Sequence, residues 1–157
     1  MRAHILKHSM AALAVCAALG LTGCKPDQSM TNEMREQEVT MSAEASDWQR
    51  DVTSWRGQHE ELLAWYGVMR DTRDSAVAGE RINDLNEHAE NVSVFQSSLE
   101  EHETALAAEH QRPERDRVMA HAELWAEHQR LKVSYSMLSD THAELMKAYT
   151  ELRGKKA

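Results

Sequence analysis

The sequence predicts an all-α protein, an elongated antiparallel three-helix bundle with coiled-coil-like heptad packing. Three observations support this fold class. Between residues 42 and 152 Ala, Glu, Leu, Arg and Gln are abundant and Gly, Val and Ile are scarce, a composition that favours helix. Apolar residues recur in alternating steps of three and four, as the buried seam of packed helices requires. Interruptions at residues 71–75 and at Pro113 divide the region into three helices.

The first helix is expected at about residues 42–72. Its seam residues are Trp48, Val52, Trp55, His59, Leu62, Tyr66 and Met69. Residues 24–41 precede this helix. They are polar and show no sustained periodicity, so we interpret the segment after Cys24 as a tether. Met30, Met34 and Met41 stand at spacings that could extend the helix backwards, and that alternative stays open.

The second helix is expected at about residues 75–110, because Asp74 or Ser75 can cap its first turn with a side-chain oxygen. Its seam residues are Leu85, His88, Val92, Phe95, Leu99, His102 and Leu106. The third helix is expected at about 113–153, since Pro113 suits a first helical turn. Leucines follow every seven residues and alternate with ring-bearing residues: Leu124, Leu131, Leu138, Leu145 and Leu152, with His121, His128, Tyr135, His142 and Tyr149.

Short turns between these helices predict which residues face each other. Consecutive helices joined by short turns are antiparallel neighbours, so facing residues have position numbers with a nearly constant sum. A first turn centred near residue 73 places His59 opposite His88. A second turn centred near residue 111 places His102 opposite His121 and Leu99 opposite Leu124. The predicted core therefore alternates apolar layers with layers that contain histidine.

The histidine layers allow three interpretations. Burying a histidine without a partner costs about 1–3 kcal/mol, so the first interpretation is structural: the layers are hydrogen-bonded internally or wet, and they fix the register of the helices. The second is a Zn or Cu site with His59 and His88, or His102 and His121, as ligands, because imidazole binds both metals well. The third is a pH sensor, since histidine changes charge between about pH 5 and 8.

The sequence lacks the arrangements that common catalytic sites require. A zinc protease helix needs His-Glu-x-x-His, but the segments that begin at His59 and His102 have no second histidine. Glu-x-x-His pairs of di-iron bundles, Gly-x-Ser-x-Gly and glycine-rich nucleotide loops do not occur either. We therefore expect a protein that is not an enzyme and that has no cofactor, apart from Zn or Cu under the second interpretation.

The N-terminus has the layout of a bacterial export signal. Arg2 and Lys7 precede an apolar run from residue 10 to residue 21, which is too short for a transmembrane helix. The run ends in Leu21-Thr22-Gly23-Cys24, which resembles the lipobox of bacterial lipoproteins. The alternative is an ordinary secretory signal, which would leave a free thiol at Cys24.

The resemblance to bacterial lipoproteins implies a lipid anchor and a compartment. It implies that residues 1–23 are a signal peptide, that Cys24 is diacylated and then N-acylated with fatty acids such as palmitate, and that the body faces the periplasm. Lys25 follows the cysteine where lipoproteins of the inner membrane tend to have aspartate. This departure implies the outer membrane, with the protein on its periplasmic face.

Charge and surface residues restrict the partners. The net charge of −8 argues against nucleic acid, which needs clustered Lys and Arg. Trp65 and Trp125 stand beside their seams, where they widen the core or, if exposed, form a protein interface. We expect a lipid-anchored periplasmic lipoprotein that acts as a non-catalytic binding or envelope-structural module, with a protein partner on its helical surface and a homo-oligomer possible through the leucine seam. The alternative is a histidine-based metal-binding lipoprotein.

Overall fold

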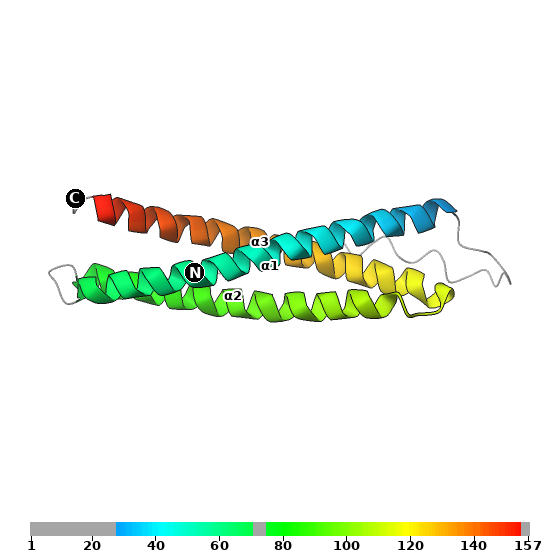
Figure 1. The fold of residues 1–157 in the computed structure, drawn as a ribbon, viewed down its shortest axis with the longest axis horizontal. Helices are drawn as coiled ribbons and strands as arrows, with labels where there is room; N and C mark the ends of the chain where they lie inside the picture. Colours follow the sequence, from blue (N-terminus) through cyan, green and yellow to red (C-terminus); the bar gives the residue numbers. More distant parts are fainter. Residues whose placement is uncertain (1–27, 71–74, 155–157) are drawn as a thin grey trace, which may run out of the picture.

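The computed structural model describes residues 28–70 and 75–154, except for the side chains of residues 28–30 and 114–115. It contains three helices, α1 (Gln28–Arg70), α2 (Ser75–Glu109) and α3 (Glu114–Gly154). They lie side by side as an elongated bundle in which α2 runs antiparallel to α1 and α3 (Figure 1). This arrangement confirms the predicted fold class.

The two ends of the bundle differ in what they contain. The start of α1 lies at the same end as the connection between α2 and α3, and the end of α3 lies at the opposite end with the end of α1 and the start of α2 (Figure 1). Helices of 43, 35 and 41 residues extend about 50–65 Å at 1.5 Å per residue. Over the residues that the structure describes, none of the three helices combines the length and apolar character needed to cross a membrane.

Heptad positions of all three helices meet along the axis and form a continuous core. The central apolar cluster contains Trp48, Trp55, Val92, Phe95, Leu99, Leu131 and Leu138. A second cluster, near the connection between α1 and α2, contains Leu62, Tyr66, Met69, Ala78, Leu85 and Leu145. A third, near the start of α1, contains Met41, Leu106 and Leu124. Most of the predicted seam residues are buried, so the spacing of apolar residues identified the core.

The expected tether over residues 24–41 needs correction, because α1 begins at Gln28 and not near Ser42. Met41 is 0% exposed and packs with Leu106 and Leu124, while Met34 is half-buried. Met34 and Met41 occupy the same heptad position as Trp48, so the seam of α1 continues backwards through polar sequence. The alternative of a backward extension is confirmed over residues 28–41.

The predicted register between α2 and α3 is wrong by one heptad. Leu124 packs with Leu106 instead of Leu99, and Leu99 shares its cluster with Leu131. The polypeptide reverses tightly after α2, where the N–H of Arg112 donates to the carbonyl of Glu109 at 3.0 Å. Leucines that repeat every seven residues fit either register, so apolar burial alone does not distinguish them.

Candidate functional site

Polar and aromatic pairs connect α1 to α3 at regular intervals along the bundle. The two helices run in the same direction, and side chains 84 positions apart meet. In each of the first four pairs an oxygen of α1 contacts a ring nitrogen or hydroxyl of α3, and in the fifth two aromatic rings pack edge to face. The pairs are Gln37–His121, Glu44–His128, Asp51–Tyr135, Gln58–His142 and Trp65–Tyr149. We refer to these five pairs as the rungs.

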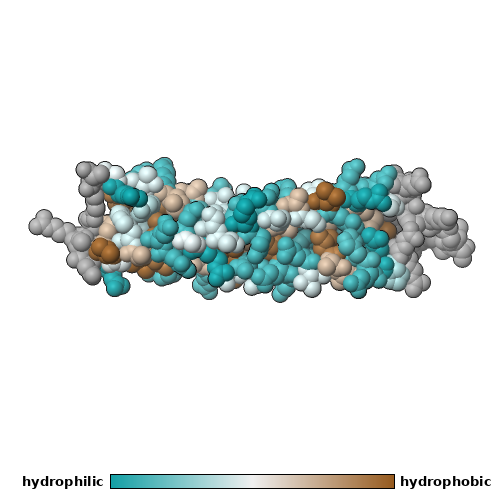
Figure 2. All heavy atoms as spheres, in the orientation of Figure 1, coloured by the Kyte–Doolittle hydropathy of each residue, from teal (hydrophilic) through white to brown (hydrophobic). Residues whose placement is uncertain are grey.

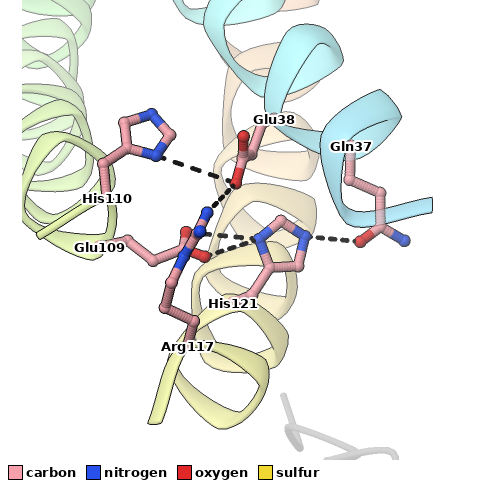
Figure 3. A network of polar contacts seen from close by, with 6 residues as sticks. All are labelled: Gln37, Glu38, Glu109, His110, Arg117 and His121. Carbon is pink, nitrogen blue, oxygen red and sulfur yellow. Dashed lines mark hydrogen bonds and ion pairs between the residues drawn. The ribbon is translucent and has the colours of Figure 1, made fainter. Parts of the chain in front are cut away.

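The first rung is joined to α2 by a buried carboxylate. Glu109 is the last residue of α2 and is 0% exposed, and His121 Nδ1 donates to its two oxygens at 3.2 and 3.3 Å. On the other side of the ring, His121 Nε2 lies 2.8 Å from Gln37 Oε1 (Figure 3). A carboxylate is unfavourable at a helix C-terminus because of the helix dipole, so His121 offsets both the burial and the position of Glu109.

A second carboxylate in the same region is held by a cation. Arg117 donates to Glu38 at 3.2 Å, and His110 Nδ1 lies 3.9 Å from the same oxygen (Figure 3). Glu38, Glu109 and His121 bring three potential ligand atoms within 4.8 Å of one another. Because Arg117 already donates to Glu38, and His121 to Glu109, we interpret this group as an ion-pair network.

The second rung extends to another histidine of α2. His128 Nε2 donates to Glu44 at 2.8 Å, so its Nδ1 accepts from His102 Nε2 at 3.3 Å. Burial alone would raise the pKa of Glu44, but hydrogen bonds from Lys132 and His128 outweigh it and hold that pKa below its usual value. Burial, and then the nearby His128, lower the pKa of His102. This layer is therefore a hydrogen-bonded row from α2 through α3 to α1.

The third rung is embedded in aromatic rings. Tyr135 stacks between Trp48 and Trp55, with ring centroids 5.4 and 5.6 Å away, and its hydroxyl donates to Asp51. Burial and the carboxylate of Asp51 raise the pKa of Tyr135 to about 12. The phenol thus remains a neutral donor over the whole physiological range.

The fourth rung forms part of a cluster of three histidines, one from each helix. His59, His88 and His142 are 3%, 1% and 6% exposed, and one ring nitrogen of each lies within 4.8 Å of the other two. Their ring centroids are 4.8 to 5.6 Å apart. We refer to these three residues as the histidine cluster.

Carbonyl oxygens orient two rings of the histidine cluster. His88 Nε2 donates to the backbone carbonyl of Leu138 at 3.0 Å, so its Nδ1 carries a lone pair and accepts from His59 Nε2 at 2.9 Å. His142 Nε2 donates to Gln58 Oε1 at 2.7 Å. Its Nδ1 is buried and has no hydrogen-bond partner within the described part of the chain. The cluster therefore holds one unused lone pair in the core.

Burial keeps the rings of the histidine cluster neutral. Desolvation, and then repulsion by His88, lower the pKa of His59 to about 4. Desolvation, and then repulsion by His88 and His59, lower the pKa of His142 to about 4. Desolvation also lowers the pKa of His88, although its hydrogen bond to Leu138 opposes the shift. Neutral imidazoles are the form that binds metal ions.

The predicted metal ligands are only partly brought together. His59 and His88 are adjacent, as the first turn predicted, whereas His102 does not face His121: it contacts His128, and His121 contacts Glu109. His102 and His121 have other partners than predicted because the register between α2 and α3 is shifted by one heptad. Cys24 and the signal peptide expected at residues 1–23 lie outside the described residues.

The sequence analysis did not single out His142 or Glu109. Both occupy heptad positions that continue a seam: His142 follows His121, His128 and Tyr135 at intervals of seven, and Glu109 follows Leu106 by three residues. Trp65 and Trp125 are half-buried: Trp65 packs against Tyr149 in the second apolar cluster, and Trp125 stacks on His128. Both therefore widen the core, which was the other interpretation that the sequence allowed for them.

Comparisons with known proteins do not add an assignment. No protein-family model matches the sequence, and neither the search of curated proteins nor the search of solved structures finds a match. The function must therefore be argued from the residues themselves.

Proposed function

We propose that this protein is a lipid-anchored periplasmic rod that carries a protein-binding surface away from the membrane, with no catalytic role. The position of α1 supports this proposal most directly. Gln28, where α1 begins, is the fourth residue after Cys24, and the helix continues without a break to Arg70. A lipid on Cys24 would therefore be followed almost at once by a helix of about 65 Å.

The rungs support a role as a stiff spacer. They recur every seven residues and connect α1 to α3 over most of their length, from Gln37 to Trp65 on α1. A bundle whose helices are linked at this many levels resists bending and sliding, because any displacement breaks several hydrogen bonds at once. The buried polar groups are thus used mainly to join helices, which supports a structural rather than a catalytic purpose.

Exposed apolar side chains occur along the whole rod, and we place the protein partner at the far end because that end lies away from the membrane. One face of the molecule is mainly hydrophilic, with apolar residues in small separate groups (Figure 2). Val68 and Val77 are 73% and 41% exposed and flank the connection between α1 and α2, which is the end opposite to the start of α1 (Figure 1). Exposed apolar side chains at this end are the contacts that we propose for the partner.

Labelling and fractionation test the anchor. Cells expressing the full chain are grown with radioactive palmitate, and their membranes are separated on a sucrose gradient. We expect label on the wild-type chain in the outer-membrane fraction, no label on Cys24→Ser, and a shift of Lys25→Asp to the inner-membrane fraction. An unlabelled wild-type chain would overturn the lipid anchor, and a labelled chain in the inner membrane would overturn the outer-membrane location.

Position-dependent cross-linking tests the partner surface. A photo-reactive amino acid replaces Val68 at the far end or, as the matched control, Val39, which is 66% exposed near the start of α1. The proposal requires a discrete cross-linked band from position 68 and none from position 39. Equal cross-linking at both positions, or cross-linking at neither, would contradict binding at the far end.

A further inference from the structure

We propose that His59, His88 and His142 form a binding site for one first-row transition-metal ion, Zn²⁺ or Cu²⁺, in the core of the bundle. This site goes beyond the role of a stiff spacer, because nothing in that role requires three imidazoles to meet. Each helix supplies one ligand. A bound metal would therefore tie all three helices together at a single level.

The spacing of the rings suits a metal with three histidine ligands. Zinc binds histidine nitrogen at about 2.0–2.1 Å, which places the nitrogens of a tetrahedral site about 3.4 Å apart. The separation between His59 Nε2 and His88 Nδ1 is 2.9 Å, and one nitrogen of each ring lies within 4.8 Å of the others. The required separation of about 3.4 Å therefore lies between the 2.9 Å of the His59–His88 contact and the 4.8 Å limit for the other nitrogens.

Hydrogen bonds fix the tautomer of two of the three rings. Histidine ligands usually donate their second ring N–H to a carbonyl or carboxylate, which fixes the tautomer and directs the other nitrogen to the metal. His88 donates to the Leu138 carbonyl and His142 to Gln58 Oε1, so Nδ1 carries the lone pair in both rings. His59 uses its Nε2 proton in the contact with His88, and it takes the other tautomer when a metal replaces that hydrogen bond.

A hydrogen-bonded pair would satisfy His59 and His88 without a third ring, yet His142 Nδ1 is buried beside them with no hydrogen-bond partner in the described residues. His102 Nδ1 is also buried without a partner, but only in the histidine cluster does an unpartnered ring stand with two further imidazoles whose nitrogens lie within 4.8 Å, among the described residues. Leaving such a nitrogen unsatisfied costs about 1–3 kcal/mol. A metal ion satisfies it and replaces the contact between the other two rings.

We place the entry side for the ion between α2 and α3. A groove on that face reaches His88, and its lining includes the side chains of Asp84, Glu87, Asn91, Thr141 and Glu144. Arg81 also lines the groove, where it pairs with Asp84 at 2.9 Å. The carboxylates of Asp84, Glu87 and Glu144 outnumber the guanidinium of Arg81 and give the groove the sign that attracts cations.

Metal titration tests the site directly. The full chain in mild detergent is stripped with a chelator, and Zn²⁺ or Cu²⁺ is added in competition with a chromophoric chelator while circular dichroism follows the thermal midpoint. We expect one equivalent of either metal to bind and to raise the midpoint, because a ligand that binds only the folded state stabilises it. For Cu²⁺, electron paramagnetic resonance should show coupling to nitrogen.

Three variants make the test specific. His142→Leu removes one ligand and should abolish the one-equivalent binding, whereas His102→Gln alters a buried histidine of a different layer and should leave it unchanged. Gln58→Leu keeps all three ligands but releases the Nε2 of His142, and it should weaken binding about 10–100-fold, which keeps the proposal testable if His142→Leu fails to fold.

Absence of one-equivalent binding to the wild-type chain, or equal affinities in Gln58→Leu and His102→Gln, would overturn the proposal. Loss of metal binding would leave the palmitate and cross-linking results for the spacer unaffected.

Discussion

Either partner of the buried pair between Glu109 and His121 should be costly to remove alone, whereas replacing both together should cost little. Glu109 is 0% and His121 3% exposed, so His121→Leu leaves a carboxylate in the core and should cost about 3–5 kcal/mol. Glu109→Leu leaves His121 Nδ1 without its partner and should cost about 1–3 kcal/mol. The double variant replaces the whole pair by apolar side chains and should cost about 1 kcal/mol or less.

A double-mutant cycle measures this coupling. Urea unfolding of the four proteins, followed by circular dichroism at pH 7.5, should give a coupling energy of about 3 kcal/mol or more. Asp47 and Arg50 provide the control cycle, since their ion pair at 2.8 Å is 61% and 71% exposed and should couple by less than about 0.5 kcal/mol. Single variants of the buried pair that each cost under about 1 kcal/mol, and that add in the double variant, would refute the reasoning.

Three further predictions concern stability and ionisation. Folding lowers the pKa of His59 and of His142 from 6.5 to about 4, so their contribution to the free energy of unfolding is complete above about pH 6.5 and is lost as the pH falls. Metal-free protein should therefore lose about 2 kcal/mol of stability per histidine by pH 5. Equal urea midpoints at pH 7.5 and 5 would contradict this. Tyr135 should ionise only near pH 12, which should appear as a late phase in an ultraviolet absorbance titration and be absent in Tyr135→Phe. A wild-type titration that is complete by pH 11 would exclude the raised pKa. Met41→Ala should lower the free energy of urea unfolding by about 2–5 kcal/mol. Val39→Ala, at an exposed position, should lower it by less than about 0.5 kcal/mol. Similar costs would mean that the helix before residue 42 is not part of the core.

Heptad periodicity was sufficient to predict the fold and the pairing of α1 with α2. Steps of three and four define which face of each helix is buried, and a short connection leaves few ways to bring two such faces together. The contact between His59 and His88 followed from these two constraints. The start of α1 was missed because Met34 and Met41 are separated by polar residues, so their burial depends on partners from α2 and α3 that lie far away in sequence.

Periodicity could not decide the register of α2 against α3. A shift of seven residues replaces leucine by leucine, so the apolar core is nearly the same in both arrangements, and the polar residues must distinguish them. In the observed register Glu109 meets His121 and His102 meets His128. Requiring a partner for the buried Glu109 would have favoured this register, and the parallel pairing of α1 with α3 would then have placed His142 beside His59 and His88.

The constant separation of the rungs limits how such a chain can change its length. Inserting one residue in α1 would turn every following side chain by about 100° around the helix axis and remove it from its partner on α3. Inserting seven residues in α1 alone would restore the facing but move every later residue of α1 one rung out of step with α3. The rod can therefore grow or shrink only when all three helices gain or lose a whole heptad at the same level, in increments of about 10 Å.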